Sequence, residues 1–92
     1  MQKSIYSDDY QHFLAELRSA RVDAGVSQEQ LAAALGEHQT FISKVERGIR
    51  RLDVVELRQW VDALDIAFPA FCQQLDARLS RHRRPTSPAR KR

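Results

Sequence analysis

Residues 36–48, GEHQTFISKVERG, carry hydrogen-bonding side chains at a spacing suited to contacts with the edges of nucleic-acid bases. In a helix, residues at i, i+3, i+4 and i+7 share one face. Here that face contains no acid, and Gln39 stands at its amino-terminal tip. Glutamine can bond adenine N6 and N7, lysine reaches guanine O6 and N7, and a threonine methyl group suits the thymine methyl. The residues on the face are Thr40, Ser43, Lys44 and Arg47.

The opposite face of the same segment is apolar and consists of Phe41, Ile42 and Val45. Packing of this face onto other helices would fix the direction of the polar stripe. An ordinary solvated helix face has the same pattern. The choice between the two interpretations therefore depends on the elements around the segment.

A short, capped helix is expected directly before this segment. Ser27 and Gln30 form the S-x-x-Q pattern of a capping box, and Gly36 stands where a left-handed helix end is expected. The small Ala32 suits a close helix crossing, and Ile42 falls on the inner face of the following helix. Two short helices joined by so short a connection predict a helix-turn-helix unit.

Helical periodicity also dominates the rest of the chain, so we expect an all-α fold of five helices. The first is predicted over residues 8–24, the fourth over 53–65 and the fifth over 69–79. Their starts are marked by Ser7, by the Asp53 and Glu56 pair, and by Pro69. The predicted buried stripes of the last two helices are Val54, Leu57, Val61 and Leu64 with Trp60 at the edge, and Phe68, Phe71, Cys72, Leu75 and Leu79.

Five short motifs, LRxxR, GVSQEQLA, LG, ISKVERG and ALDI, resemble the phage-repressor and Cro-like helix-turn-helix family, also called xenobiotic-response-element-like. They cover about residues 14–66, more than half of the chain. The resemblance implies a compact, lambda-repressor-like bundle of five helices, usually a homodimer, that binds operator DNA. It places the helix-turn-helix in the second and third helices, with the recognition helix at about residues 39–47 of a domain that spans residues 8–79.

Within this resemblance the polar stripe becomes a set of expected DNA contacts. The expected base contacts are Gln39, Thr40, Ser43 and Lys44. The expected phosphate contacts are Gln28, where family members commonly hold the DNA backbone, and Arg47, Arg50 and Arg51, which cluster after the recognition helix. Phosphate contacts position a protein without carrying sequence information. The alternative for the three arginines is plain surface solubility.

Two further positions match family members in a structural role. Arg21 and Glu46 stand where many members form a salt bridge between the first and third helices. Two other positions depart from the family pattern. His38, preceded by Glu37, occupies the N-cap of the third helix, where serine or threonine is usual, and Asp65 replaces the glycine usual after the fourth helix.

The fifth predicted helix carries more large apolar side chains than a thin bundle needs. We therefore expect a two-fold symmetric dimer interface on it, with the exposed edge of the fourth helix alongside. The sequence alone does not divide this stripe between the core of one chain and the interface. The expected interface residues are Phe68, Phe71, Leu75 and Leu79, with Val55, Gln59 and Trp60 from the fourth helix.

The formal net charge of +3 hides an uneven distribution of charge. Residues 78–92 hold seven of the fifteen Lys and Arg residues and no acid, whereas residues 1–77 hold eight against twelve Asp and Glu. Residues 80–92 are expected to be a disordered basic tail. The tail is either a solubilising end or an electrostatic arm for phosphates. Residues 1–7 are expected to be an N-terminal extension.

Composition argues against several classes of protein. A length of 92 residues supports one small domain. Cys72 is the single cysteine, no apolar run reaches membrane-spanning length, and no signal peptide is visible, so we expect a cytoplasmic protein without membrane contact. The three histidines lack metal-ligand spacing and no catalytic set is visible, so neither an enzyme nor a cofactor is expected.

The sequence therefore predicts a sequence-specific transcriptional regulator, expected to be a repressor that binds double-stranded DNA at a palindromic operator as a homodimer. Two alternatives keep the same fold. The first is the antitoxin of a toxin–antitoxin pair, which would also bind its toxin and would be indicated by a neighbouring toxin gene. The second is a protein-interaction adaptor, which would enrich no DNA sequence from a random pool.

Overall fold

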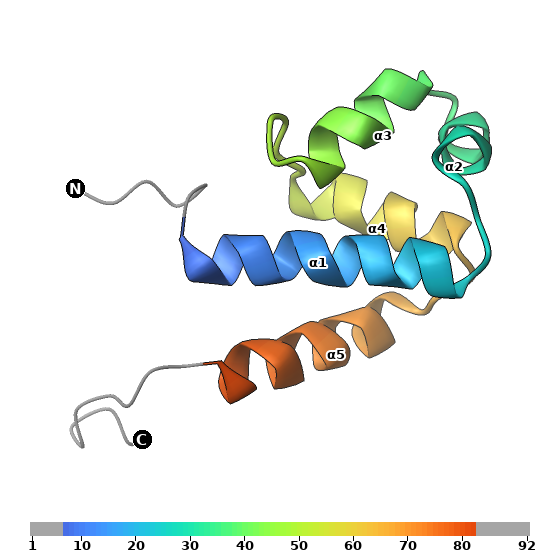
Figure 1. Cartoon of the computed structure of the whole chain (residues 1–92). Coiled ribbons are helices and arrows are strands. Elements are labelled where there is room, and N and C mark those ends of the chain that lie inside the picture. Colours follow the sequence, from blue (N-terminus) through green and yellow to red (C-terminus); the bar gives the residue numbers. More distant parts are fainter. Residues whose placement is uncertain (1–6, 83–92) are drawn as a thin grey trace, which may run out of the picture.

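The computed structural model describes residues 7–82, and in that part of the chain all regular structure is helical (Figure 1). The five helices are α1 (Asp8–Asp23), α2 (Gln28–Leu35), α3 (Gln39–Glu46), α4 (Val54–Ala63) and α5 (Phe68–Arg81). Helix α5 packs along α1, while α2 packs against both α3 and α4. The predicted all-α fold of five helices is confirmed.

Local sequence signals account for three of the helix starts. The Ser7 hydroxyl accepts a hydrogen bond from the backbone N–H of Tyr10, 3.1 Å away. Ser27 with Gln30, and Asp53 with Glu56, form complete capping boxes at the starts of α2 and α4. Such caps satisfy backbone N–H groups that have no partner inside the helix.

Glycines end the two helices of the helix-turn-helix. Gly36 closes α2 in the left-handed conformation, with φ of +70°, and so allows the sharp turn into α3. Gly48, with φ of +82°, follows α3, and a Cβ atom built there would lie 3.0 Å from Cδ1 of Leu14 in α1. The turn after α3 is therefore pressed directly against α1.

The core lies where the five helices meet, and Trp60 is one of its fully buried side chains. The Trp60 side chain is 0% exposed, although the sequence pattern placed it at the edge of the α4 stripe. Val54, predicted to be buried, is 64% exposed because it is the first residue of α4. Cys72, predicted on the apolar stripe of α5, is also exposed. The fully or nearly fully buried apolar side chains are Leu14, Leu17, Leu31, Ala32, Ile42, Val45, Trp60, Val61, Leu64 and Phe71.

Helix α5 begins one residue before the predicted start and ends two residues beyond the predicted end. Ser80 and Arg81 belong to the helix, so the prediction of a disordered tail from residue 80 onward is wrong for these two positions. Residues 83–92 of the predicted tail lie outside the described residues, as do residues 1–6 of the N-terminal extension.

Contacts with α1 explain why the last turn of α5 continues. Nη1 of Arg78 lies 3.1 Å from Oε1 of Glu16, and Nε of Arg78 donates to Nδ1 of His12 over 3.4 Å. The rings of His12 and His82 stack with centroids 4.0 Å apart. Partial desolvation lowers the pKa of His82, and the nearby His12, Arg81 and Arg78 act in the same direction, which favours the neutral form of His82.

Candidate nucleic-acid interface

Helix α3 is held by its apolar face and offers its polar face to solvent. Ile42 and Val45 are fully buried, and Phe41 packs partly buried against the core. The predicted base-contact residues Gln39, Thr40 and Lys44 are exposed, and Ser43 is half-buried. The helix ends at Glu46, so Arg47, predicted as its last residue, is its C-cap.

A chain of hydrogen bonds connects the tip of α3 to the protein interior. Nε2 of Gln39 donates to Oε1 of Gln28 over 2.6 Å. Nε2 of Gln28 in turn donates to Oε1 of Glu46 over 3.0 Å. The predicted phosphate contact Gln28 therefore orients the predicted base contact Gln39.

Glu46, at the inner end of this chain, is paired with Arg21 of α1. Nε and Nη2 of Arg21 lie 2.7 Å and 3.0 Å from the two carboxylate oxygens of Glu46. Nη1 of Arg21 donates to the carbonyl oxygen of Val26, 3.0 Å away. The two side chains are only 9% and 5% exposed. This forked pair ties α1 to the carboxyl end of α3.

The two adjacent arginines of the loop after α3 have different surroundings. Nη1 and Nη2 of Arg50 pair with the two oxygens of Glu56 at 2.8 Å and 2.9 Å. This fork raises the pKa of Arg50 and lowers the pKa of Glu56. The Arg51 guanidinium instead lies 4.4 Å from the ring centroid of Tyr10. Among the described residues, Arg51 has no acid within salt-bridge distance.

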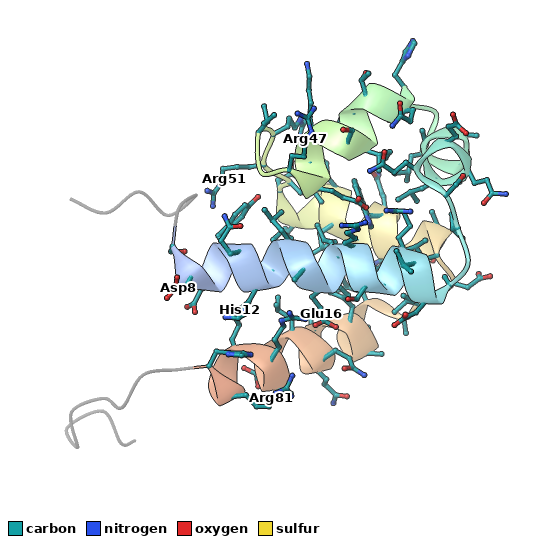
Figure 2. All side chains as sticks on the ribbon, viewed as in Figure 1. Asp8, His12, Glu16, Arg47, Arg51 and Arg81 are labelled. Carbon is teal, nitrogen blue, oxygen red and sulfur yellow. The ribbon has the colours of Figure 1, made fainter. Side chains whose placement is uncertain are left out.

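Arg47 is the remaining arginine among the predicted phosphate contacts, and it stands at the carboxyl end of α3. Its Nε donates to Oγ of Ser43, one turn earlier, over 3.1 Å. In Figure 2, Arg47 and Arg51 lie on the α3 side of α1, whereas Glu16 and Arg81 lie on the α5 side. Arg47 and Arg51 therefore lie on the same side of α1 as α3.

The N-cap of α3 differs from the usual serine or threonine of the family, as the sequence indicated. His38 occupies the N-cap with extended backbone angles, and its side chain makes no capping hydrogen bond. Its carbonyl oxygen accepts a hydrogen bond from the backbone N–H of Phe41, 2.9 Å away.

The predicted dimer interface is wrong in two of its residues. Phe71 is 2% exposed and Trp60 is fully buried, so both are used by the core of a single chain. Phe68, Leu75 and Leu79 are half-buried, and Val55 and Gln59 are exposed. The exposed large apolar side chains in the described part of the chain are Val22, Ile49, Val54 and Val55. The exposure of Ile49 was not predicted from the sequence. The available indication was its position in a short loop, directly before two arginines.

Comparisons with known proteins agree with this geometry. A helix-turn-helix family model matches residues 17–71, more than half of the chain. The structure of an XRE-family like protein from Pseudomonas syringae pv. tomato str. DC3000 is similar, with a TM-score of 0.71 and 40% sequence identity. The match covers 75% of this chain and 84% of that one. A search of curated proteins finds no match.

The chain belongs to the Cro/C1-type helix-turn-helix family, the XRE family. Proteins of this family are DNA-binding transcription regulators, and this chain is one of them. Among residues 7–82, no helix is long and apolar enough to cross a membrane.

Proposed function

We propose that the chain represses transcription by binding a palindromic operator as a homodimer, with α3 in the major groove. The observation that carries this proposal is the two-faced environment of α3. Its inner side chains Ile42 and Val45 are fully buried, while Gln39, Thr40 and Lys44 remain exposed. A rigidly held helix with an exposed, acid-free polar face is suited to direct reading of base edges.

Gln39 is proposed to read one base pair with its remaining hydrogen-bonding groups. An amide nitrogen has two N–H donors, and only one is needed for the 2.6 Å bond to Gln28. The second donor and the carbonyl oxygen can then bond adenine N7 and N6 together. The contact with Gln28 therefore supports a fixed, bidentate contact by Gln39. Thr40, Ser43 and Lys44 are proposed to contact neighbouring bases.

The Gln39→Ala variant should lose preference at one base pair in each half-site. Loss of one bidentate contact reduces discrimination there by about 1–3 kcal/mol. The measurement is selection of bound duplexes from a random pool, followed by affinity measurement on single-base variants of the selected site. Gln73→Ala, on the exposed side of α5, is the matched control and should leave the preference unchanged. Equal weakening on every sequence would show that Gln39 reads no base.

The same selection tests the broader proposal. A two-fold symmetric site, with half-sites about one helical turn apart, is expected for two copies of α3 placed about 34 Å apart. An asymmetric site would contradict the homodimer, and enrichment of no sequence would favour the adaptor alternative.

The dimer interface is proposed to lie at the start of α4. Ile49, Val54 and Val55 are 60%, 64% and 61% exposed, and they fall within seven residues of the chain. Their neighbours in the sequence are Arg50 and Arg51, so this surface lies in the loop that carries two of the arginines predicted from the sequence to contact DNA. A second copy docked there would bury these side chains and place both α3 helices on one face of the dimer.

The Val55→Glu variant should weaken dimerisation about tenfold or more, because a carboxylate would be buried without a partner. Sedimentation equilibrium at several protein concentrations measures the effect. Val22→Glu, at an exposed valine near the end of α1, is the control and should dimerise as the unmodified chain does. If the Val22 variant is monomeric and the Val55 variant is not, the interface lies elsewhere.

A further inference from the structure

The loop between α3 and α4 contains two arginines in a row, and their surroundings point to different tasks. We propose that Arg51, held over the ring of Tyr10, is the DNA phosphate contact of this loop, and that Arg50, paired with Glu56, is a positioning residue. The inference rests on the proposed DNA binding and makes it specific for the loop.

Three of the five N–H donors of Arg50 are already used inside the protein, and its charge is paired with that of Glu56. Its Nη1 bonds both Oε1 of Glu56 and, at 2.6 Å, the carbonyl oxygen of Arg51. Its Nη2 bonds the other oxygen of Glu56, and the guanidinium lies 4.9 Å from the ring centroid of Phe41. A phosphate could reach only the Nε–H and the second Nη2–H of Arg50, and there it would compete with the carboxylate of Glu56 for the same positive charge.

Glu56 strengthens this assignment because it has a second structural role. Its Oε1 also accepts from the backbone N–H of Asp53, 2.9 Å away, and so completes the capping box of α4. A DNA phosphate placed on Arg50 would meet the negative charge of Glu56 at close range. Arg50 therefore connects three elements: Glu56 of α4, Phe41 of α3, and the backbone of the loop between them.

Arg51 keeps its charge and its donors available. Among residues 7–82, no acid neutralises Arg51 and no acceptor takes a hydrogen bond from its guanidinium. The N–H groups of a guanidinium lie in its plane, so stacking on a ring leaves its edge free to donate. A stacked arginine can thus hold two phosphate oxygens while its face remains on the ring.

Tyr10 is a fixed platform for this arginine. Its ring packs against Phe13, with centroids 5.4 Å apart, and against the core. Its hydroxyl is buried and has no hydrogen-bond partner among residues 7–82. Burial raises the pKa of Tyr10, an effect that Arg51 opposes. The ring, rather than the hydroxyl, is therefore the part of Tyr10 that serves Arg51.

Salt dependence separates the two arginines. The experiment measures binding to a random-sequence 20-base-pair duplex by fluorescence anisotropy over a series of salt concentrations. The slope of log K against log salt is negative, and each lost phosphate contact makes it less steep by about 0.9. Arg51→Gln should show this loss for every bound protomer, whereas Arg50→Gln should keep the slope and lower the unfolding midpoint. Arg58→Gln, on the exposed face of α4, is the matched control and should change neither.

The role of Tyr10 is tested with the same duplex. Tyr10→Phe keeps the ring and should keep the affinity. Tyr10→Leu should weaken binding about threefold or more, and adding this change to Arg51→Gln should cause little further loss, since both act through one contact. Additive losses would remove Tyr10 from this role.

The outcomes distinguish this inference from the proposed function. A flat salt plot for the unmodified chain would contradict the DNA-binding proposal and, with it, the assignment of Arg51. A steep plot that Arg51→Gln leaves unchanged, or that Arg50→Gln flattens, would overturn only the division of tasks between the two arginines.

Discussion

Replacement of Glu46 by alanine is expected to lower the free energy of unfolding by about 3–5 kcal/mol. The Arg21 residue is 8% exposed, and two of its nitrogens bond the carboxylate of Glu46. Without that carboxylate, a guanidinium would remain buried and unpaired, and Gln28 would lose its acceptor as well. Denaturant unfolding of the purified variant, followed by helical circular dichroism, measures the loss.

Two companion variants show whether the loss comes from the unpaired charge. Glu29→Ala removes an exposed acid from the first turn of α2 and should cost less than about 1 kcal/mol. Combining Glu46→Leu with Arg21→Met removes both charges and should recover much of the stability, because no buried ion is left alone. If Glu46→Ala costs no more than Glu29→Ala, the pair does not hold α1 to α3 in solution.

The second large effect is expected in DNA binding. If Arg47 and Arg51 of both protomers each neutralise one phosphate, log K should fall with log salt at a slope of about −3.6. The affinity for the operator would then fall on the order of a hundredfold between about 50 and 200 mM salt. Fluorescence anisotropy with the duplex selected from the random pool provides the measurement.

A basic C-terminal arm would add to this slope. Residues 83–92 hold five of the arginines and lysines of the chain and no acid. If they contact phosphates, a chain that ends at residue 82 should bind all sequences more weakly by a similar factor and show a shallower slope. An unchanged slope would leave these residues with a solubilising role. A nearly flat plot for the full chain would refute the phosphate contacts altogether.

The starts of α2 and α4 were predictable because their signals are local. Each capping box joins residues three apart, Ser27 with Gln30 and Asp53 with Glu56, and needs no other part of the fold. Which face of a helix is buried depends on the neighbouring helices, so the sequence of α4 alone did not determine which of its side chains face the core. Periodicity alone placed Val54 inside and Trp60 at the edge, whereas the packing of α2 and α5 around α4 reverses them.

In the candidate site, too, features set by local sequence were predictable and features set by distant residues were not. The polar face of α3 could be found from spacing alone, because its members lie on one helix. The hydrogen bonds of Gln28 could not, since its partners Gln39 and Glu46 are 11 and 18 residues away. The end of α5 was misjudged for a similar reason: composition suggested a tail, but Arg78 reaches Glu16, 62 residues earlier in the chain.

The chain of hydrogen bonds from Arg21 through Glu46 and Gln28 to Gln39 affects how this protein could be given a new operator. A library that varies position 39 alone would select chiefly side chains able to bond the amide of Gln28. Varying positions 28 and 39 together, with Arg21 and Glu46 kept, would release that restriction while the pair that holds α1 to α3 stays intact. The useful unit of redesign is therefore a pair of residues on two helices.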